Sequence, residues 1–460
     1  MTVMAVTLAY LLFLPVAALC FWRLSCRTAI LVTAIGGWLL LPVAHYPRLA
    51  EGSDLAWCIV GIALPSDMLV TKAWIAPVVA LIGGAICDRA AIKAWRPTAI
   101  DAPMTLWCVW PLVPGLVVGG GDPPPVIAAL YITGAWGVPW LIGRVWFADR
   151  EGGLMLTRGL ALSGLALTPI AIIETVRPPL LYGLFYGPHP FRFDGIYRYF
   201  GYRPLGFMED GNLYGLWATI GALAAIWVAR RPAELDEKRF WFIVAAVTTG
   251  VAIAAQSVGA LVLLAIGVAV MLLRNVAIVL PALAVAATGV LGLAAVHFSG
   301  VVPLRTLAAG AVGQQTIGTL RAVGRQSFAW RVSQDIKTLP GATAAPIAGT
   351  SRWDWWRRFG TRPWGQPLLI IGQYGLIGLA LAWGSLALAA AAGLVRYRRW
   401  GDRVDDGTVV PLALVVILTL ADALLNAFFF SAAILAAGAI ARHPGQNRGA
   451  RRPGVGRVAD

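Results

Sequence analysis

The chain alternates between long apolar runs and short polar connections over almost its entire length. A helix of about 20 apolar residues crosses the hydrocarbon core of a bilayer, and a helix satisfies its own backbone hydrogen bonds there. The pattern therefore predicts an all-α, polytopic membrane protein that forms one integral membrane domain over residues 1–460, with about 12 to 13 transmembrane helices. The candidate spans are 3–22, 28–45, 69–87, 103–119, 126–143, 155–176, 212–229, 241–256, 258–273, 276–298, 367–395, 409–424 and 426–441.

Basic residues predict which ends of these helices face the cytoplasm, because short cytoplasmic loops are enriched in Lys and Arg. Basic clusters fall in alternate connections, and the tail 442–460 is also strongly basic. A cytoplasmic tail requires residues 409–441 to cross the membrane twice, as a tight hairpin. The clusters in the connections are 23–27, 89–96, 144–150, 230–239, 274 and 396–403.

Composition excludes several classes of protein. With 59% hydrophobic and 13% charged residues, the chain is too apolar for a soluble globular protein. The net charge of +15 would suggest nucleic acid in a soluble protein, but here the topology accounts for it, and we expect no nucleic-acid partner. The five cysteines form no CxxC pair and no Cys/His ligand spacing, so we expect neither disulfides nor a metal site.

Two long connections, 177–211 and 299–366, are predicted on the outer side of the membrane. The second contains nine basic residues, two acidic residues and five tryptophans. Arginine grips phosphate oxygens through its planar fork, and indole faces can pack on sugar rings. This loop is therefore expected to bind a ligand that is both anionic and ring-shaped. The alternative is a solvated, partly disordered loop.

Residues 314–337 of this loop are predicted to form one helix that ends at Leu339-Pro340-Gly341. Arg321 and Arg325 stand four positions apart and would share one face of that helix. Like charges at this spacing destabilise a bare helix, and an anionic partner would offset the repulsion. Trp330-Arg331 follows on the same helix.

The first long loop combines aromatic and charged residues. Nine residues between Tyr182 and Tyr202 are aromatic, which is typical of a belt at the membrane interface. Such a belt does not explain Arg203 or the pair Glu209-Asp210 as well. These charges lie beside the next apolar span, where an unpaired charge is costly. These three charges are therefore candidates for function.

Two polar interruptions occur inside apolar segments. Gln256-Ser257 divides the run 241–273, and either bonds to neighbouring helices or marks a kink beside a cavity. Asp422 and Asn426 lie within the predicted final hairpin. Asp422 is an intramembrane acid and thus a functional candidate, or it caps a turn.

Four stretches resemble the O-antigen ligase and polymerase superfamily of bacterial envelope glycosyltransferases. The similarity covers residues 170–395 and depends on the order of the stretches and their place in the predicted topology. The stretches are Tyr202–Phe207 continuing to Asn212-Leu213-Tyr214-Gly215; Gln256–Leu261; Ala329-Trp330-Arg331 with Leu339-Pro340-Gly341 and Ile347–Thr350; and Gln373–Leu379.

The resemblance implies a GT-C-like helical fold in the bacterial inner membrane. It implies transfer of glycan from an undecaprenyl-diphosphate-linked donor to a saccharide or lipid acceptor at the periplasmic face, with no metal and no other cofactor. The family's arginines hold the diphosphate, and Arg203 and Arg331 match them best. Ligases of this family usually carry a His before the span that corresponds to 367–395. That His is missing here, which favours a polymerase or a divergent exopolysaccharide enzyme.

The predicted mechanism is inverting transfer. An acceptor hydroxyl attacks the anomeric carbon, and preorganised arginines stabilise the departing diphosphate. The candidate catalytic residues are Arg203, Arg331, and as general bases Glu209 or Asp210, with Asp354 a weaker choice. The candidate substrate-binding residues are Arg321, Arg325, Arg352, Trp330 and Asn212.

Two other functions fit a polytopic chain of this kind. One is a transporter or flippase of lipid-linked sugars, which needs charges or helix breaks near the midplane of the membrane. The other is a non-catalytic membrane component of a polysaccharide export complex. The concentration of charge in the outer loops favours the enzyme over the transporter, whereas turnover of a lipid-linked substrate by the purified protein would distinguish the enzyme from the non-catalytic component.

Overall fold

The computed structural model describes residues 2–43, 61–62, 70–178, 180–187, 189, 197–231, 234–273, 281, 284–285, 288–292, 310–322, 326–400 and 408–441. This part of the chain is almost entirely helical, apart from one two-stranded antiparallel ribbon. Five of its helices are long and apolar enough to cross a membrane, or up to six if one bent pair counts as a span. The expectation of an all-α, multi-pass protein is confirmed at this level.

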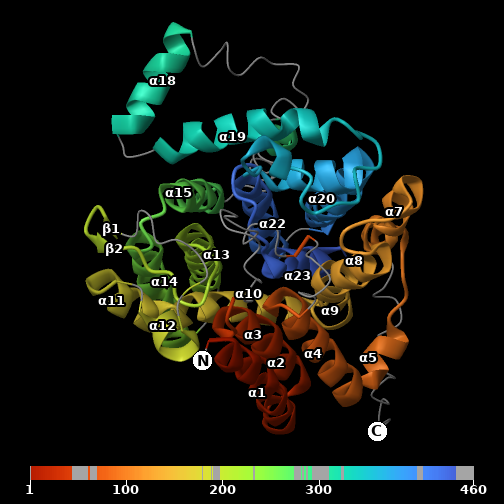
Figure 1. Ribbon diagram of the computed structural model, residues 1–460. Coiled ribbons are helices and arrows are strands. Elements are labelled where there is room, and N and C mark those ends of the chain that lie inside the picture. Colours follow the sequence, from red (N-terminus) through yellow and green to blue (C-terminus); the bar gives the residue numbers. More distant parts are fainter. Residues whose placement is uncertain are drawn as a thin grey trace, which may run out of the picture.

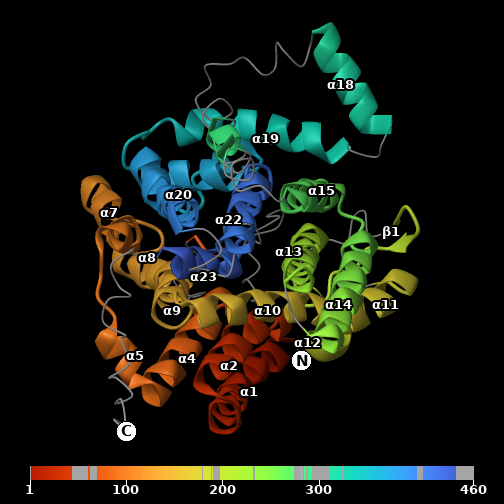
Figure 2. The ribbon, with the colours of Figure 1, turned by 180° about the vertical axis from the view of Figure 1, so that it is seen from behind.

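After α1, which has 22 residues, the first part of the chain forms shorter, frequently broken helices, two of which continue through a π-helical turn (Figures 1 and 2). The elements are α1 (Thr2–Arg23), α2 (Cys26–Leu31), η1 (Val32–Gly36), α3 (Gly37–Leu40), α4 (Lys72–Cys87), α5 (Arg89–Ala94), η3 (Ala99–Asp101), α6 (Ala102–Val109), α7 (Leu112–Val118), α8 (Pro125–Ile132), η4 (Thr133–Gly137) and α9 (Val138–Trp146).

The rest of the chain contains the longest helices and the ribbon. The elements are α10 (Arg150–Ala166), α11 (Thr168–Val176), α12 (Leu181–Tyr186), β1 (Tyr197–Arg198), β2 (Gly201–Tyr202), α13 (Gly211–Ala229), α14 (Leu235–Ala254), α15 (Val258–Leu272), α18 (Ala311–Ala322), α19 (Gln326–Ala342), η5 (Arg357–Phe359), α20 (Gln366–Trp400), α22 (Val409–Ala423) and α23 (Ser431–Ile440).

Helix α13 is the most deeply buried of the candidate spans. It packs against α10 at a pair of glycines, where a Cβ added to Gly221 would lie 2.6 Å from Gly164 Cα. Helix α23 approaches α9 in the same way, since a Cβ on Gly438 would lie 2.3 Å from the Trp140 carbonyl oxygen. Small residues allow such close approach of helices in lipid. Figures 1 and 2 show α18 and α19 at one margin of this bundle.

Several predicted spans differ from the observed helices. Residues 103–119 form two helices, α6 and α7, which meet at a bend of 40°. The predicted pair 241–256 and 258–273 is present as α14 and α15, separated at Gln256-Ser257 as expected. The span 276–298 lies mostly outside the described residues.

The final hairpin is also more broken than predicted. The helix expected at 426–441 begins only at Ser431 and has 10 residues, which cover about 15 Å. Residues 426–430 between α22 and α23 are buried without forming a helix or strand. Irregular backbone at this depth is tolerated where it is buried in protein or lines a cavity.

The single helix predicted over 314–337 is wrong. Helix α18 ends at Ala322 and α19 begins at Gln326. Gly324 stands in the interval, and glycine is a poor helix former. Nor does Leu339-Pro340-Gly341 end the second helix, because α19 continues through Pro340 to Ala342. Arg321 lies on α18, and Arg325 lies outside the described residues.

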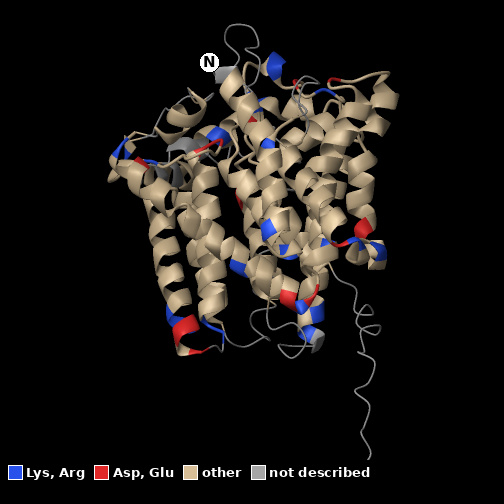
Figure 3. Cartoon of the chain, turned by 90° about the horizontal axis from the view of Figure 1, so that it is seen from below, with Lys and Arg blue, Asp and Glu red and all other residues tan. Residues whose placement is uncertain are grey.

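The connections that contact each other are those predicted to share a side of the membrane. Charged residues gather toward two opposite ends of the helices (Figure 3). Contacts at each end agree with the sides inferred from basic clusters. At the predicted cytoplasmic end the pairs include Arg27–Asp149, Arg158–Glu237 and Arg396–Ile440, and at the other end Lys72–Glu209, Arg203–Ala255 and Arg331–Asn426.

Candidate functional site

The segment before α13, residues 203–209, is buried although it forms neither helix nor strand. Buried backbone N–H and C=O groups need hydrogen-bond partners, so a buried coil requires side chains that supply them. Three side chains from other parts of the chain do so here, and they fix the path of the segment that contains Arg203 and Glu209.

Glu174, on α11, holds the centre of the segment. One of its carboxylate oxygens accepts the backbone N–H groups of Leu205 and Gly206, each at 2.8 Å. Its other oxygen accepts the N–H of Leu181 at 3.3 Å. Glu174 is fully buried, and a carboxylate that accepts backbone N–H groups is satisfied without a cation. Glu174 was not among the residues that the sequence indicated as functional.

Lys72 and His189 hold the other end of the segment. The Lys72 ammonium group donates to the Phe207 carbonyl oxygen at 2.9 Å, and His189 Nε2 lies 3.0 Å from the Met208 carbonyl oxygen. The same ammonium group lies 3.3 Å from Glu209, and the two side chains are only 1% and 3% exposed. Glu209, a predicted general base, is therefore turned inward and paired with a buried lysine.

Arg203 lies at the start of the segment and is 7% exposed. Its guanidinium group donates to Asn212 Oδ1 at 2.6 Å and to the Ala255 carbonyl oxygen at 3.3 Å. Ser257 donates to the same Asn212 oxygen at 3.2 Å. Neutral oxygens accept these bonds, so they orient the guanidinium group without neutralising its charge.

Asp210 follows the buried segment directly and makes two contacts. Its carboxylate accepts the N–H of Asn212 at 2.6 Å and caps the N-terminus of α13. It also lies 4.0 Å from the Arg203 guanidinium group, with its side chain 30% exposed. Of the two acids predicted here, Asp210 is the one that a ligand can reach.

Gln256, in the break between α14 and α15, binds the β1–β2 ribbon. Its side-chain oxygen accepts the Phe200 N–H at 3.4 Å, and its side-chain nitrogen donates to the Tyr202 carbonyl oxygen at 3.2 Å. The Gln256 carbonyl oxygen accepts from Arg198 at 3.5 Å. Its φ of 49° is in the left-handed region, which is strained for a residue other than glycine. The break predicted at Gln256-Ser257 thus serves to hold the segment that precedes α13.

Arg331 lies on α19 and reaches the broken hairpin. It donates to Asn426 Oδ1 and, at 3.3 Å, to the Leu425 carbonyl oxygen. Asn426 in turn donates to Asp422 at 2.8 Å. Asn426 therefore connects Arg331 on α19 both to the non-helical segment 426–430 and, through Asp422, to the end of α22.

One indole lies close to both Arg331 and a second arginine. The Trp364 ring lies 5.0 Å from the Arg331 guanidinium carbon and 3.8 Å from that of Arg362, both within cation–π range. Trp330 meets the same ring edge to face at 5.0 Å. Asp335 accepts the backbone N–H groups of Trp364 and Gly365 at 2.5 and 3.2 Å. Trp330 is half-exposed, so it remains available to a ligand.

The rest of the large outer loop is packed against the bundle. Trp353 donates to Asp122, in the connection between α7 and α8, at 2.9 Å. Trp353, Trp355 and Trp356 are buried, so these three indoles are not available to stack on sugars as the sequence suggested. Arg352 is exposed and forms a two-pronged contact with Asp354, at 3.1 and 3.2 Å.

The loop also runs along a break in α20. Gly375 has φ 71° and ψ −177° in the middle of this helix. Residues 346–351 lie beside the break, where Thr350 N–H donates to the Gly372 carbonyl oxygen at 2.9 Å and Leu376 N–H to the Pro346 carbonyl oxygen at 2.7 Å. The long loop is thus joined to the span that follows it.

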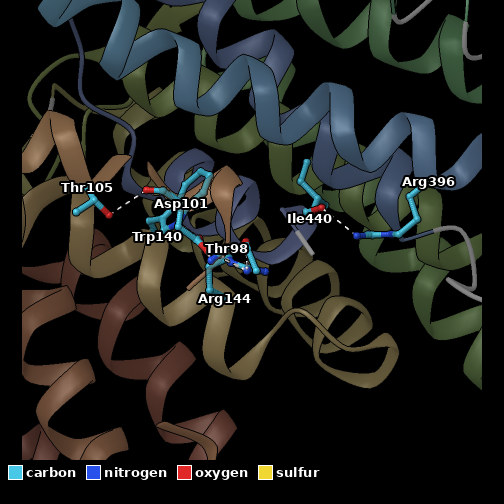
Figure 4. A network of polar contacts seen from close by, with 7 residues as sticks. All are labelled: Thr98, Asp101, Thr105, Trp140, Arg144, Arg396 and Ile440. Carbon is cyan, nitrogen blue, oxygen red and sulfur yellow. Dashed lines mark hydrogen bonds and ion pairs between the residues drawn. The ribbon is translucent and has the colours of Figure 1, made fainter. Parts of the chain in front are cut away.

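A separate polar network lies at the opposite end of the bundle (Figure 4). Asp101 accepts from Arg144 at 2.8 and 3.1 Å and from Trp140 at 2.9 Å, with Arg144 and Asp101 buried. Thr98 also donates to this carboxylate, through its backbone N–H and its hydroxyl group. The buried charge of Asp101 is therefore well satisfied, and we interpret this network as structural.

The structure brings Arg203, Asp210 and Asn212 together, but it does not join Arg203 and Arg331 through a described contact. Arg203 contacts α13 and the α14–α15 break, whereas Arg331 contacts the α22–α23 hairpin. An aromatic pair lies between these elements, since Trp217 of α13 and Phe430 are 4.7 Å apart. Arg325 and the side chain of Arg321 lie outside the described residues.

Three important residues, Lys72, Glu174 and Asn426, were not selected from the sequence as site residues. Lys72 and Glu174 stand inside predicted spans, which is a signal of function or pairing in itself.

Among the described residues, no group of three His, Cys, Asp or Glu side chains could hold a metal ion. An open apolar groove of about 450 Å³ lies between α6 and α20, and neither Arg203 nor Arg331 lines it.

The four stretches that carry the family resemblance form two contacting pairs. The segment 202–215 contacts the break at 255–257, and residues 347–350 contact the start of 373–379. Comparison of the chain with family models, with curated proteins and with solved structures gives no match.

Proposed function

We propose that this protein is a membrane-embedded glycosyltransferase of the O-antigen ligase or polymerase type. It transfers glycan from an undecaprenyl-diphosphate-linked donor to a saccharide or lipid acceptor at the periplasmic face of the bacterial inner membrane. The observation that carries the proposal is the fixed orientation of the Arg203 guanidinium group by Asn212 and by the break at 255–257.

The chemistry of the donor explains why such an arginine is useful. When the acceptor oxygen bonds to the anomeric carbon, the bond from that carbon to the diphosphate oxygen breaks, and the diphosphate leaves with additional negative charge. A donor group that is already oriented stabilises this charge without reorganisation during the reaction. Burial in a low-dielectric region strengthens the interaction, and Arg203 is 7% exposed.

Arg331 supplies a second cationic group on a different element. Asn426 and Leu425 orient it, and Trp364 covers its guanidinium group. The exposed face of Trp330 next to it offers an aromatic surface to a sugar ring. We assign Arg331 and Trp330 to donor binding, together with Arg352, whose side chain is 56% exposed.

The acceptor hydroxyl loses its proton as the new bond forms. Glu209 is buried against Lys72, whereas the Asp210 carboxylate is partly exposed beside Arg203. Asp210 is therefore the better candidate to receive that proton. It lies beside Arg203, the residue to which we assign stabilisation of the leaving diphosphate.

The experiment uses purified protein in lipid nanodiscs with lipid-linked repeat units and an acceptor glycan. We expect Arg203→Ala and Arg331→Ala each to reduce product formation at least about 100-fold. Arg239→Ala is the control, since this arginine is 77% exposed at the opposite end. Normal polymer length in cells that carry both substitutions, at normal protein levels, would rule out the proposed role of these arginines.

Transport of a lipid-linked sugar is the second candidate. Transporters contain charged residues and non-helical segments near the midplane of the membrane. This chain contains a buried charge pair, Lys72–Glu209, and a buried non-helical segment, 426–430. Vesicles that contain only this protein separate the two functions. Movement of a labelled lipid-linked sugar across the bilayer without any new glycosidic bond would favour the transporter.

A further inference from the structure

Lys72 occupies an unfavourable position for a lysine. It is the first residue of α4, where the helix dipole presents partial positive charge, and its side chain is 1% exposed. Burying a charge is costly unless it is paired. A residue retained there must therefore make contacts that compensate for both effects.

Among the described residues, both polar contacts of the Lys72 side chain are to the segment that precedes α13. It donates to the Phe207 carbonyl oxygen at 2.9 Å and pairs with the Glu209 carboxylate at 3.3 Å. Its ammonium group also lies 5.1 Å from the centre of the Trp38 ring, which stacks on Trp217 of α13. Lys72 thus joins the N-terminal helices to the segment that begins with Arg203.

Glu209 depends strongly on this contact. Its carboxylate is buried, and apart from the Lys72 ammonium group no described residue donates to either of its oxygens. Removal of the lysine leaves a buried carboxylate without its cation, so the group must take up a proton or move toward water. In either case the Phe207 carbonyl oxygen loses its donor, and the end of the segment 203–209 loses the contact that holds it.

We infer that Lys72 is a positioning residue for Arg203. It holds the end of the segment 203–209 while Glu174 holds its centre. The two together fix the backbone from which the Arg203 side chain extends, and Asn212 then orients its guanidinium group. This inference rests on the proposed function only for its catalytic consequence, since the positioning itself is a property of the folded chain.

The first test measures positioning without any activity. Hydrogen–deuterium exchange is followed in purified full-length protein in nanodiscs, for Lys72→Met and for Arg144→Met. The control breaks another buried ion pair, Asp101–Arg144. We expect Lys72→Met to speed exchange of peptides from 203–210 about tenfold, and Arg144→Met to leave them unchanged. Unchanged exchange in Lys72→Met, or the same change in both variants, would overturn the inference.

A second variant covers the case in which Lys72→Met does not fold. Lys72→Met/Glu209→Leu removes both buried charges, which a protein often tolerates. The Phe207 carbonyl oxygen still loses its donor, so exchange in 203–210 is expected to stay elevated in this variant. Wild-type exchange there would count against Lys72 as a positioning residue.

The last test is a double-mutant cycle on glycan transfer. If Lys72 acts through Arg203, Lys72→Met lowers kcat about tenfold in the native background and has little effect when Arg203 is already Ala. Equal effects in both backgrounds would show that Lys72 does not act through Arg203. If no transfer activity is found at all, the proposed function fails, while the exchange experiment still decides whether Lys72 positions the segment.

Discussion

Arg203 donates a hydrogen bond to Asn212 Oδ1 at 2.6 Å, across the turn that leads into α13. The same oxygen accepts from Ser257, so one amide joins the arginine to the break between α14 and α15. Asn212 accordingly determines both the direction of the guanidinium group and the distance between two segments that are far apart in the sequence.

Asn212→Ala is expected to reduce glycan transfer about tenfold or more, because Arg203 loses the group that orients it. Asn212→Asp keeps the geometry but places a negative charge beside the guanidinium group, so it should also reduce transfer, by weakening attraction for the diphosphate. Product formation per folded protein is the measurement, and Thr105→Ala at the opposite end is the control. Full activity of Asn212→Asp would argue against diphosphate binding by Arg203.

Glu174→Gln is expected to lower the free energy of unfolding by ~1–3 kcal/mol. One carboxylate oxygen accepts the N–H groups of both Leu205 and Gly206, and the other accepts that of Leu181. An amide offers only one acceptor oxygen in place of two, so one of these contacts is lost. Unfolding in a denaturing-detergent titration provides the value. Glu151→Gln, with a side chain that is 91% exposed, should stay within ~0.5 kcal/mol of the wild type. Equal effects of the two substitutions would show that Glu174 does not support the segment.

Gly375→Ala and Gly384→Ala should have opposite effects although both lie in α20. Gly375 has a φ of 71°, and an added Cβ would lie 2.0 Å from the Ile347 carbonyl oxygen, so its substitution should cost at least ~2 kcal/mol. A Cβ at Gly384 meets nothing within 4 Å, so alanine there should stabilise the helix by up to ~1 kcal/mol. Thermal unfolding in detergent distinguishes them, and a tolerated Gly375→Ala would mean that α20 is regular at this position.

At Gln256 we expect glycine to be a milder substitution than alanine, by ~1 kcal/mol in the free energy of unfolding. Both remove the hydrogen bonds to Phe200 and Tyr202, but only glycine relieves the strain of a φ of 49°. The comparison uses the midpoints of thermal unfolding for the two variants. If alanine proved the milder change, the left-handed backbone at this position would be refuted.

The hydrophobic pattern alone was sufficient to predict an all-α, multi-pass chain, because the need to satisfy backbone hydrogen bonds in lipid leaves helices as the simplest solution. Basic clusters divided the connections into two groups, and the observed contacts join members of the same group. The break at Gln256-Ser257 could also be predicted, since a polar pair inside an apolar run is a local signal.

Local signals were insufficient where a helix depends on what surrounds it. Nothing in the pattern of Val409–Ile440 indicates that residues 426–430 leave the helix, and the surrounding protein makes that conformation possible by burying it. The three indoles at 353, 355 and 356 were read as surface for a sugar, whereas contacts with the bundle bury them.

The sequence by itself determined which charged residues interrupt the apolar pattern and on which side of the membrane most of them are expected. Only the tertiary structure decided their partners: Lys72 contacts Phe207 across 135 positions and Arg331 contacts Asn426 across 95. Periodicity and composition describe neighbours along the chain, whereas the pairing of a buried charge depends on which helices pack against each other. That packing depends on side-chain shape and small residues across the whole bundle.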